Sequence, residues 1–118
     1  GILNIEYKSH IDFKAEDFPA HKEAILKLCD NIPRPFLIDL RHTYFSAISN
    51  DALKLLAKDK EIQEARLCNA FVIEKIADRL VVNFYLRIFQ PENPAKTFKT
   101  PEAAIEWCKK FITQKARG

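Results

Sequence analysis

The chain has 118 residues, of which 47% are apolar and 30% are charged, and its net charge is +3. This length is enough for one hydrophobic core and too short for two, so we expect a single domain over residues 1–118. Positive and negative charges are nearly balanced, so the chain lacks the strongly basic surface of nucleic-acid binders. No window contains the roughly 18 apolar residues of a membrane-spanning helix. We therefore expect neither a nucleic-acid partner nor an integral membrane segment.

Cysteines and histidines are few and widely spaced. They form no CxxC pair and no metal-binding pattern, so we expect no metal site and no cofactor. The apolar neighbours of the cysteines favour reduced core thiols, and from this we expect a cytoplasmic location. The chain starts at Gly1 and contains no methionine, which leaves open an additional strand upstream. The cysteines are Cys29, Cys68 and Cys108.

The first third of the chain predicts a strand, a helix and a second strand. Apolar and polar residues alternate over 2–8, which is typical of a half-exposed strand near a sheet edge. Apolar side chains at steps of three and four predict a helix from about 16 to 30, which two prolines then terminate. The unbroken apolar run over 35–40 predicts a strand that is buried on both faces. The expected buried stripe of the helix comprises Phe18, His21, Ile25 and Leu28.

A second helix and a second central strand are predicted next. The hydroxyl of Ser49 is placed to cap a helix over 50–57. Residues 58–64 are highly charged and predict a surface loop with a short helical turn. The apolar run over 69–74 predicts a strand, and the helical connection makes it parallel to the strand over 35–40. We expect these two strands to lie side by side in the sheet.

Residues 76–89 allow two interpretations. Their β-branched and aromatic content favours a strand, whereas their length favours a helix, since strands usually have about five or six residues. We therefore predict a helix that is apolar on nearly all sides. One face is expected to pack on the sheet, and it comprises Ala77, Leu80, Val81, Phe84 and Ile88. The other face is expected to need a dimer partner, an apolar ligand or an unseen strand, and it comprises Val82, Tyr85, Leu86 and Phe89.

The C-terminal part predicts a short edge strand and a last helix. Residues 95–98 form the expected strand. Thr100 offers a capping hydroxyl and Pro101 suits the first helical position, so we expect the helix to begin there. Its expected buried face comprises Ala104, Trp107, Cys108 and Phe111.

Three segments and the order of the elements carry a resemblance to a known family. The segments are 36–41, 70–73 and 97–107, and in the last a strand ending in phenylalanine leads through an acidic turn to a helical tryptophan. The chain resembles the STAS domain, the SpoIIAA-like fold of anti-sigma-factor antagonists, and in particular the uncharacterised STAS-like proteins of bacteria such as Bacteroidetes. The resemblance implies a single α/β domain whose sheet of about four strands, two of them central and parallel, is flanked by helices.

The resemblance also implies a candidate phosphorylation site. In antagonist STAS domains, a strand that ends in Asp-Leu is followed by an Asp-Ser-Ser-Gly motif whose second serine is phosphorylated. Alignment of Asp39 and Leu40 with that strand end puts Ser49 at the second serine and Asn50 at the glycine. The aspartate, the first serine and the glycine are not retained. Ser49 is thus a candidate phospho-acceptor in an incomplete motif, and a simple helix cap is the alternative.

Polar residues lie at and after the end of the first central strand, at the carboxyl edge of the sheet where open α/β folds bind their ligands. A surface for a partner or a small anion is predicted there. The alternative is that Asp39 and Arg41 only form hydrogen bonds with neighbouring groups of the loop. The candidate surface comprises Asp39, Arg41, His42, Ser49 and Asn50.

No catalytic motif occurs in the chain, and the resemblance implies a non-enzymatic domain that acts through protein–protein contacts in a regulatory role. Its partner is another protein or a second copy of the chain, which would form a homodimer. The alternative is a carrier of a lipid or another apolar small molecule, because STAS-like folds are similar to the CRAL-TRIO lipid-transfer domain. An enzyme that uses Asp39 and His42 is the third interpretation.

Overall fold

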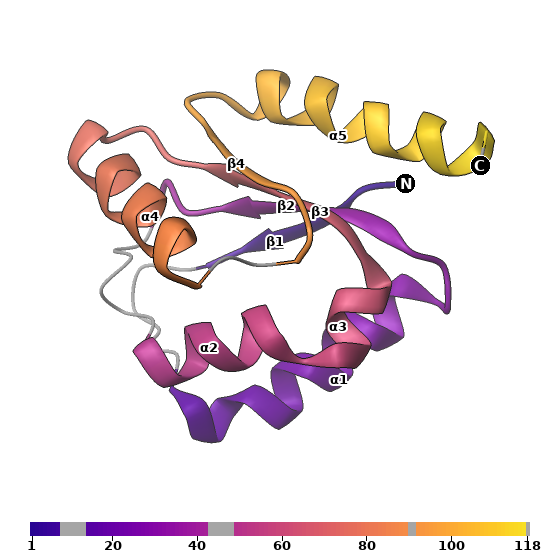
Figure 1. Cartoon of the computed structure of the whole chain (residues 1–118), viewed down its shortest axis with the longest axis horizontal. Coiled ribbons are helices and arrows are strands. Elements are labelled where there is room, and N and C mark those ends of the chain that lie inside the picture. Colours follow the sequence, from indigo (N-terminus) through magenta and orange to yellow (C-terminus); the bar gives the residue numbers. More distant parts are fainter. Residues whose placement is uncertain (8–13, 43–48, 90–91, 118) are drawn as a thin grey trace.

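Four parallel strands form the central sheet, and the computed structural model describes residues 1–7, 14–42, 49–89 and 92–117 of the chain (Figure 1). In the order in which they lie side by side, the strands are β1 (Leu3–Glu6), β2 (Arg34–Asp39), β3 (Arg66–Val72) and β4 (Ala95–Phe98). Leu37 of β2 stands opposite Ala70 of β3 in parallel register. The predicted central pair of parallel strands is therefore confirmed, although β3 begins at Arg66, three residues before the expected start.

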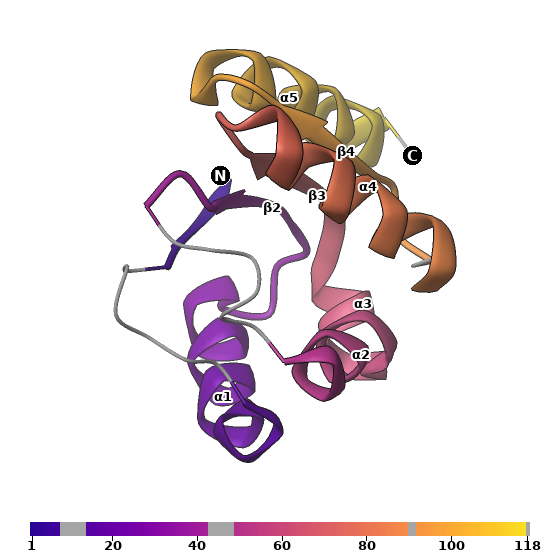
Figure 2. The same ribbon diagram turned by 90° about the vertical axis from the view of Figure 1, so that its left-hand side faces the viewer.

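Helices cover both faces of the sheet. The strands lie in the sheet in the same order as in the sequence, and right-handed crossovers between such parallel strands place the connecting helices on one face. The helices are η1 (Ala15–Asp17), α1 (Phe18–Cys29), α2 (Asn50–Lys58), α3 (Lys60–Ala65), α4 (Ile76–Phe89) and α5 (Pro101–Arg117). As Figures 1 and 2 show, α1, α2 and α3 lie on one face, α4 lies beside β4, and α5 covers the opposite face.

Alternate strand residues enter different layers of the core, as the period of two in a strand requires. On the α5 side, Leu37, Ala70 and Val72 pack against Ala104 and Cys108. On the other side, the strand residues Leu3 and Phe36 pack against Phe18, Ile25, Cys29 and Ile62 of the helices α1 and α3. The sheet is therefore covered by apolar packing on both faces, as all-parallel sheets are.

Helix α1 follows the predicted pattern with one correction. Pro19 lies in its first turn, where the missing N–H removes no intrahelical hydrogen bond. Leu28 was predicted in the buried stripe, but it is exposed, and Cys29 is buried in its place. The reason is that Cys29 continues the step of four from Ile25 and so stays on the face that meets the sheet.

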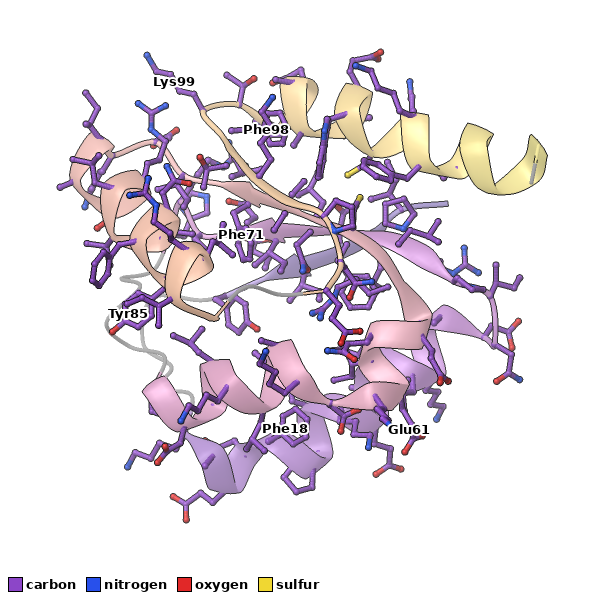
Figure 3. The ribbon with its side chains drawn as sticks, in the orientation of Figure 1. Phe18, Glu61, Phe71, Tyr85, Phe98 and Lys99 are labelled. Atoms are coloured by element: carbon purple, nitrogen blue, oxygen red, sulfur yellow. The ribbon has the colours of Figure 1, made fainter. Side chains whose placement is uncertain are left out.

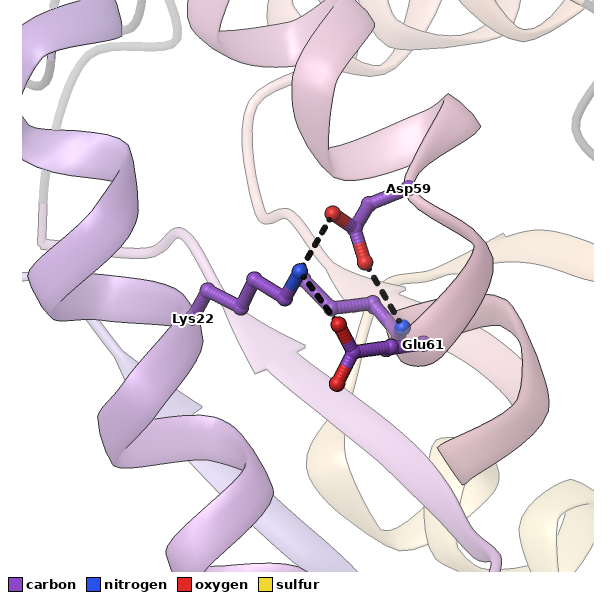
Figure 4. Close-up of polar contacts among 4 residues, drawn as sticks. Lys22, Asp59 and Glu61 are labelled. Atoms are coloured by element: carbon purple, nitrogen blue, oxygen red, sulfur yellow. Dashed lines mark hydrogen bonds and ion pairs between the residues drawn. The ribbon is translucent and has the colours of Figure 1, made fainter.

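A three-residue polar cluster joins α1 to the junction between α2 and α3 (Figure 4). Lys22 Nζ lies 2.9 Å from Asp59 Oδ2 and 3.0 Å from Glu61 Oε1. The other carboxylate oxygen of Asp59 accepts a hydrogen bond from the backbone N–H of Ile62 at 3.0 Å. Asp59 therefore caps α3 and at the same time holds α1 beside it.

The helix predicted over 76–89 is present as α4, but its two faces are reversed relative to the prediction. Val82 is 1% exposed and, with Tyr85 and Leu86, packs against the core cluster that contains Ala52 and Ile73. The face that was expected on the sheet is exposed instead, and it comprises Ala77, Leu80, Val81, Phe84 and Ile88. Ile76 is exposed beside it. The side chain of Phe89 lies outside the described residues. Because α4 is apolar on nearly all sides, its own periodicity does not indicate which face is buried. The buried face is determined by contacts with α2 and with the end of β3.

Within the part of the chain that the structure describes, no helix is both long enough and apolar enough to cross a bilayer.

Candidate functional site

At the carboxyl edge of the sheet, Asp39 and Arg41 form a closed pair. Arg41 donates from Nη2 to Asp39 Oδ2 at 2.7 Å and from Nε to Oδ1 at 2.9 Å, and its backbone N–H also donates to Oδ1 at 3.0 Å. The side-chain hydrogen bond from Arg41 is the main cause that lowers the pKa of Asp39. Both carboxylate oxygens of Asp39 therefore accept hydrogen bonds from Arg41 at the end of β2.

This pair predicts a pH-dependent contribution to stability. The pKa of Asp39 is lower in the folded chain than in the unfolded chain, so its ionised form stabilises the fold above about pH 4, and this stabilisation is lost as the pH falls through the lowered pKa. Asp39→Asn should therefore be less stable than the wild type at pH 7 and should approach it near pH 3. Urea unfolding at both pH values measures the difference. In an Arg41→Ala background, the same substitution should have little effect at either pH, and a deficit that persists unchanged at pH 3 would contradict the assignment.

Ser49 acts as the N-cap of α2. Its Oγ accepts a hydrogen bond from the backbone N–H of Ala52 at 3.1 Å, and Asp51 adds a negative charge to the first turn. His42 is exposed after β2, and its charge helps to lower the pKa of Asp39. Among the described residues, no hydrogen bond or ion pair joins Ser49 to this edge, and the side chain of Asn50 lies outside the description. The structure thus brings Asp39, Arg41 and His42 together and gives Ser49 a separate capping contact.

Removal of this cap should weaken the fold by a modest amount. Ser49→Ala leaves the N–H of Ala52 without its side-chain acceptor and is expected to lower the free energy of unfolding by about 1 kcal/mol. Chemical denaturation measures this loss. Ser49→Asp keeps an acceptor at the same position and should retain most of the stability, so an equal loss in both variants would argue against the cap.

A cavity of about 90 Å³ lies between the sheet and the helices α1, α2, α3 and α4. Most of its lining is apolar, and it includes Phe71 from the sheet and Tyr85 from α4, both labelled in Figure 3. Five of the lining residues carry polar side-chain atoms, and they are Tyr7, His21, Arg66, Asn69 and Tyr85. A mostly apolar cavity with a few polar groups is the usual composition of a small-molecule site.

Arg66 reaches this cavity because the pairing of β2 and β3 is irregular at its start. Arg34 stands opposite Arg66, whereas the next residue, Pro35, stands opposite Cys68, so Leu67 is an extra residue in β3. Such a bulge changes the face on which the preceding side chain lies. Without it, Arg66 would share the α5 face with Cys68; instead its guanidinium carbon lies 5.9 Å from the ring centre of Phe36 on the cavity side.

The guanidinium of Arg66 is held at two of its three nitrogens. Nε donates to Asn93 Oδ1 at 2.9 Å, and Nη1 donates to the carbonyl oxygen of Leu56 at 3.3 Å. Asn93 in turn donates to the carbonyl oxygens of Arg66 and Gln63, at 2.8 and 3.2 Å. Burial lowers the pKa of Arg66 to about 10, which leaves it charged at neutral pH. A cation is therefore held in the core next to the cavity.

The Tyr7–His21 pair forms another polar part of the lining. The hydroxyl of Tyr7 lies 3.1 Å from His21 Nε2, and the two rings stack with 5.8 Å between their centres. Burial raises the pKa of Tyr7 and lowers the pKa of His21, so both side chains are neutral near pH 7. His21, which was predicted in the stripe of the helix, thus contributes a polar atom to the cavity.

The outer face of α4 carries five of the nine exposed large hydrophobic side chains among the described residues. Its central side chains are 57–68% exposed and follow one another at steps of four, and they are Ile76, Leu80, Phe84 and Ile88. A groove of about 570 Å³ between α2 and α4 adjoins this stripe, lined by Leu55 and Ile88 together with Lys54, Lys58 and Asp59. Contiguous apolar surface with a charged rim is typical of a protein interaction site.

The sequence analysis did not identify Arg66 and Asn69 as candidate residues. Their only signal was polarity in an otherwise apolar run, since an asparagine that is predicted on a fully covered strand must find partners inside the core. For Arg66 even that signal was hidden, because the strand was expected to start after it. Within the described residues, no group of three or more His, Cys, Asp or Glu side chains is arranged to hold a metal ion.

Comparison with solved structures supports the class that the fold defines. The chain is similar to an uncharacterised protein of the DUF3478 family, with a SpoIIAA-like fold, from Shewanella loihica PV-4. The TM-score is 0.57 at 15% sequence identity, over 90% of this chain and 79% of the other. The protein described here thus has a SpoIIAA-like α/β fold, as the resemblance to STAS domains implied.

Residues 1–112 match a family described as a domain of unknown function, DUF7793, and the chain belongs to this family. Comparison with curated proteins gives no match.

Proposed function

We propose that this protein is a non-enzymatic regulatory module that acts through contacts with other proteins, and that the outer face of α4 is its contact surface. The observation that carries the proposal is the stripe of Ile76, Leu80, Phe84 and Ile88, which leaves four large apolar side chains 57–68% exposed on one helix. Exposure of this much apolar surface on a single helix favours a protein partner, because burying it at an interface is favourable.

The geometry of the stripe suits a helix as its counterpart. Side chains at steps of four form a ridge along the helix surface, and such ridges pack into the grooves of a second helix. A second copy of α4 presents the same ridge, so a symmetric dimer would bury both stripes at once. We therefore propose a second copy of the chain as the first partner to test. The three buried free thiols suit a cytoplasmic setting for this contact.

Ser49 offers a point of regulation within the same proposal. A phosphate at the start of α2 would add up to about two negative charges near the N–H groups of its first turn. Phosphorylation would also replace the hydroxyl contact that Ser49 makes with Ala52.

Site-specific photo-crosslinking tests the contact. A photoreactive residue at Leu80 or Phe84, introduced in cells, should yield a discrete adduct, and an adduct of twice the chain mass identifies a second copy. The same residue at Lys110, on the exposed side of α5, is the matched control and should yield none. If the α4 positions give no more adduct than Lys110, the proposed surface is wrong.

The internal cavity favours a second function, the binding of an apolar small molecule. Its lining is predominantly apolar and includes Val82, Tyr85 and Leu86, which the sequence analysis named as a possible contact face for an apolar ligand, although on the outer side of the helix. Native mass spectrometry of freshly purified protein tests this function. A co-purified small molecule that is released on unfolding would support the carrier role, and a bare chain mass across gentle purification conditions would argue against it.

A further inference from the structure

The groove between α2 and α4 is positively charged at the end of α4. Ile88, in the last turn of α4, lines this groove together with Lys54 and Lys58 of α2, and both lysines are exposed. The acidic residue of the lining, Asp59, is already bound by Lys22 at 2.9 Å. Among the described residues, neither Lys54 nor Lys58 forms an ion pair. These two charges are therefore available to an acidic group outside the chain.

The start of α4 carries acidic side chains. Glu74 directly precedes the helix and is exposed, and Asp78 lies in its first turn and is half-buried. Within the part of the chain that the structure covers, neither carboxylate forms an ion pair. Of the two cations at this end, Arg79 is half-buried with its Nε enclosed, and Lys75 already takes part in another interaction.

The two ends of α4 cannot neutralise each other within one copy. The helix has 14 residues, and at a rise of 1.5 Å per residue it is about 20 Å long. Exposed charges at that distance are largely screened in physiological salt. An acidic group that pairs with Lys54 and Lys58 must therefore come from another molecule.

The apolar stripe on α4 can pack against a reversed copy of itself. It begins with Ile76 and ends with Ile88, and Leu80 and Phe84 occupy the two central positions. When two copies meet in opposite directions about the midpoint between Leu80 and Phe84, isoleucine faces isoleucine and leucine faces phenylalanine. Two-fold symmetry makes each of these contacts occur twice.

The charges distinguish this orientation from a parallel one. In the antiparallel pair, the acidic start of one α4 lies at the lysine-lined end of the other. In a parallel pair, the groove lysines of both copies would meet at the same end, together with the exposed Arg87 of each copy. Juxtaposed like charges are unfavourable, so the antiparallel orientation fits the charge distribution better.

We propose that the contact surface on α4 binds a second copy in antiparallel orientation, with Glu74 and Asp78 of each copy facing Lys54 and Lys58 of the other. This inference rests on the proposed contact through α4, and it names the orientation of the partner and the charges that select it. Burial of the two stripes supplies the driving force. The four charged residues determine the register and disfavour partners that lack an acidic helix start.

Cross-linking between introduced cysteines tests the orientation. Ile76→Cys and Ile88→Cys are prepared as separate proteins, since both positions are more than half exposed and the native cysteines are buried. With a short bifunctional thiol reagent, a mixture of the two should give a cross-linked dimer. Either variant alone should give little, because equal positions lie about 18 Å apart along an antiparallel pair. The wild type under the same treatment is the control. Cross-linking of one variant alone, as strong as that of the mixture, would show a parallel pair and overturn the inference.

Charge reversal tests the contacts at the ends of α4. Lys58→Glu and Glu74→Lys should each weaken dimerisation about tenfold in sedimentation equilibrium, because like charges then meet twice in the interface. The double variant restores opposite charges and should return to within about threefold of the wild type. Lys110→Glu, on the exposed side of α5, is the matched control and should dimerise like the wild type. A double variant as weak as the single variants would show that these residues do not face each other.

The outcomes separate this inference from the proposed contact surface. A chain that remains monomeric overturns the antiparallel dimer, whereas a photo-crosslinked adduct between Leu80 and a different, identified protein would leave α4 as the contact surface. A dimer that cross-links in the parallel pattern overturns the orientation alone. A monomeric mass together with no adduct from α4 would overturn both.

Discussion

Val82→Asp is expected to destabilise the protein by about 4 kcal/mol, because it places a carboxylate at a position that is 1% exposed and packed against Ala52 and Ile73. Val81→Asp is the matched control, since Val81 is the preceding residue of the same helix and is 43% exposed. The carboxylate at residue 81 stays in water, so this variant should lose less than about 1 kcal/mol.

Denaturant unfolding of the two variants measures this difference. The comparison tests directly which face of α4 is buried, because the two variants carry the same substitution in the same helix. If Val81→Asp were the more damaging of the two, α4 would have the orientation that the sequence analysis predicted. Comparable losses in both variants would indicate that α4 is buried on both sides, as in an assembled dimer.

Phe36→Ala is expected to lower the free energy of unfolding by about 4 kcal/mol. Phe36 lies in the central strand β2, is 2% exposed, and packs beneath the guanidinium of Arg66. Its truncation removes apolar contacts with the helices α1 and α3 and leaves a void that the sheet cannot close. Thermal and urea denaturation both report the loss.

The matched control is Phe84→Ala on the outer face of α4, where the ring is 60% exposed. The same truncation there should change the stability of the monomer by less than about 1 kcal/mol. A large loss at Phe84 that depends on protein concentration would instead show that the ring is buried in an assembly, which the proposed dimer through α4 requires.

The order of elements was predictable from the sequence because each central strand has a distinct local signal. The runs over 35–40 and 69–74 are short, apolar and bounded by turn residues, and the connection between them carries a capped helix. These local features determine a parallel pair without knowledge of distant contacts. Likewise, the length of the segment over 76–89 was enough to favour a helix over a strand.

The orientation of α4 and the polar lining of the cavity were not predictable in the same way. The buried face of α4 depends on contacts with Ala52, which is remote in sequence, and with Ile73 just after β3, and its own residues are apolar on both sides. The placement of Arg66 depends on a one-residue bulge between β2 and β3. A bulge is a property of two paired strands, so no pattern within β3 alone indicates it.

At the carboxyl edge of the sheet, the structure adds a contact that the sequence analysis did not predict. Asp39 is the last residue of β2 and Arg41 follows the strand, but spacing alone could not show that the two side chains bind each other. That contact depends on the turn immediately after β2. It engages both carboxylate oxygens of Asp39 within the turn.

The parallel arrangement of all four strands also has a consequence for how the chain reaches this structure. No two neighbouring strands are joined by a tight hairpin, so every strand pairing requires closure of a segment that contains a complete helix. Closure of such segments loses chain entropy before the pairing contacts form, and folds dominated by non-local pairing reach the native state more slowly than helical bundles of similar size. The folding rate should therefore respond most to substitutions where β2 meets β3, since that pairing joins the two halves of the sheet.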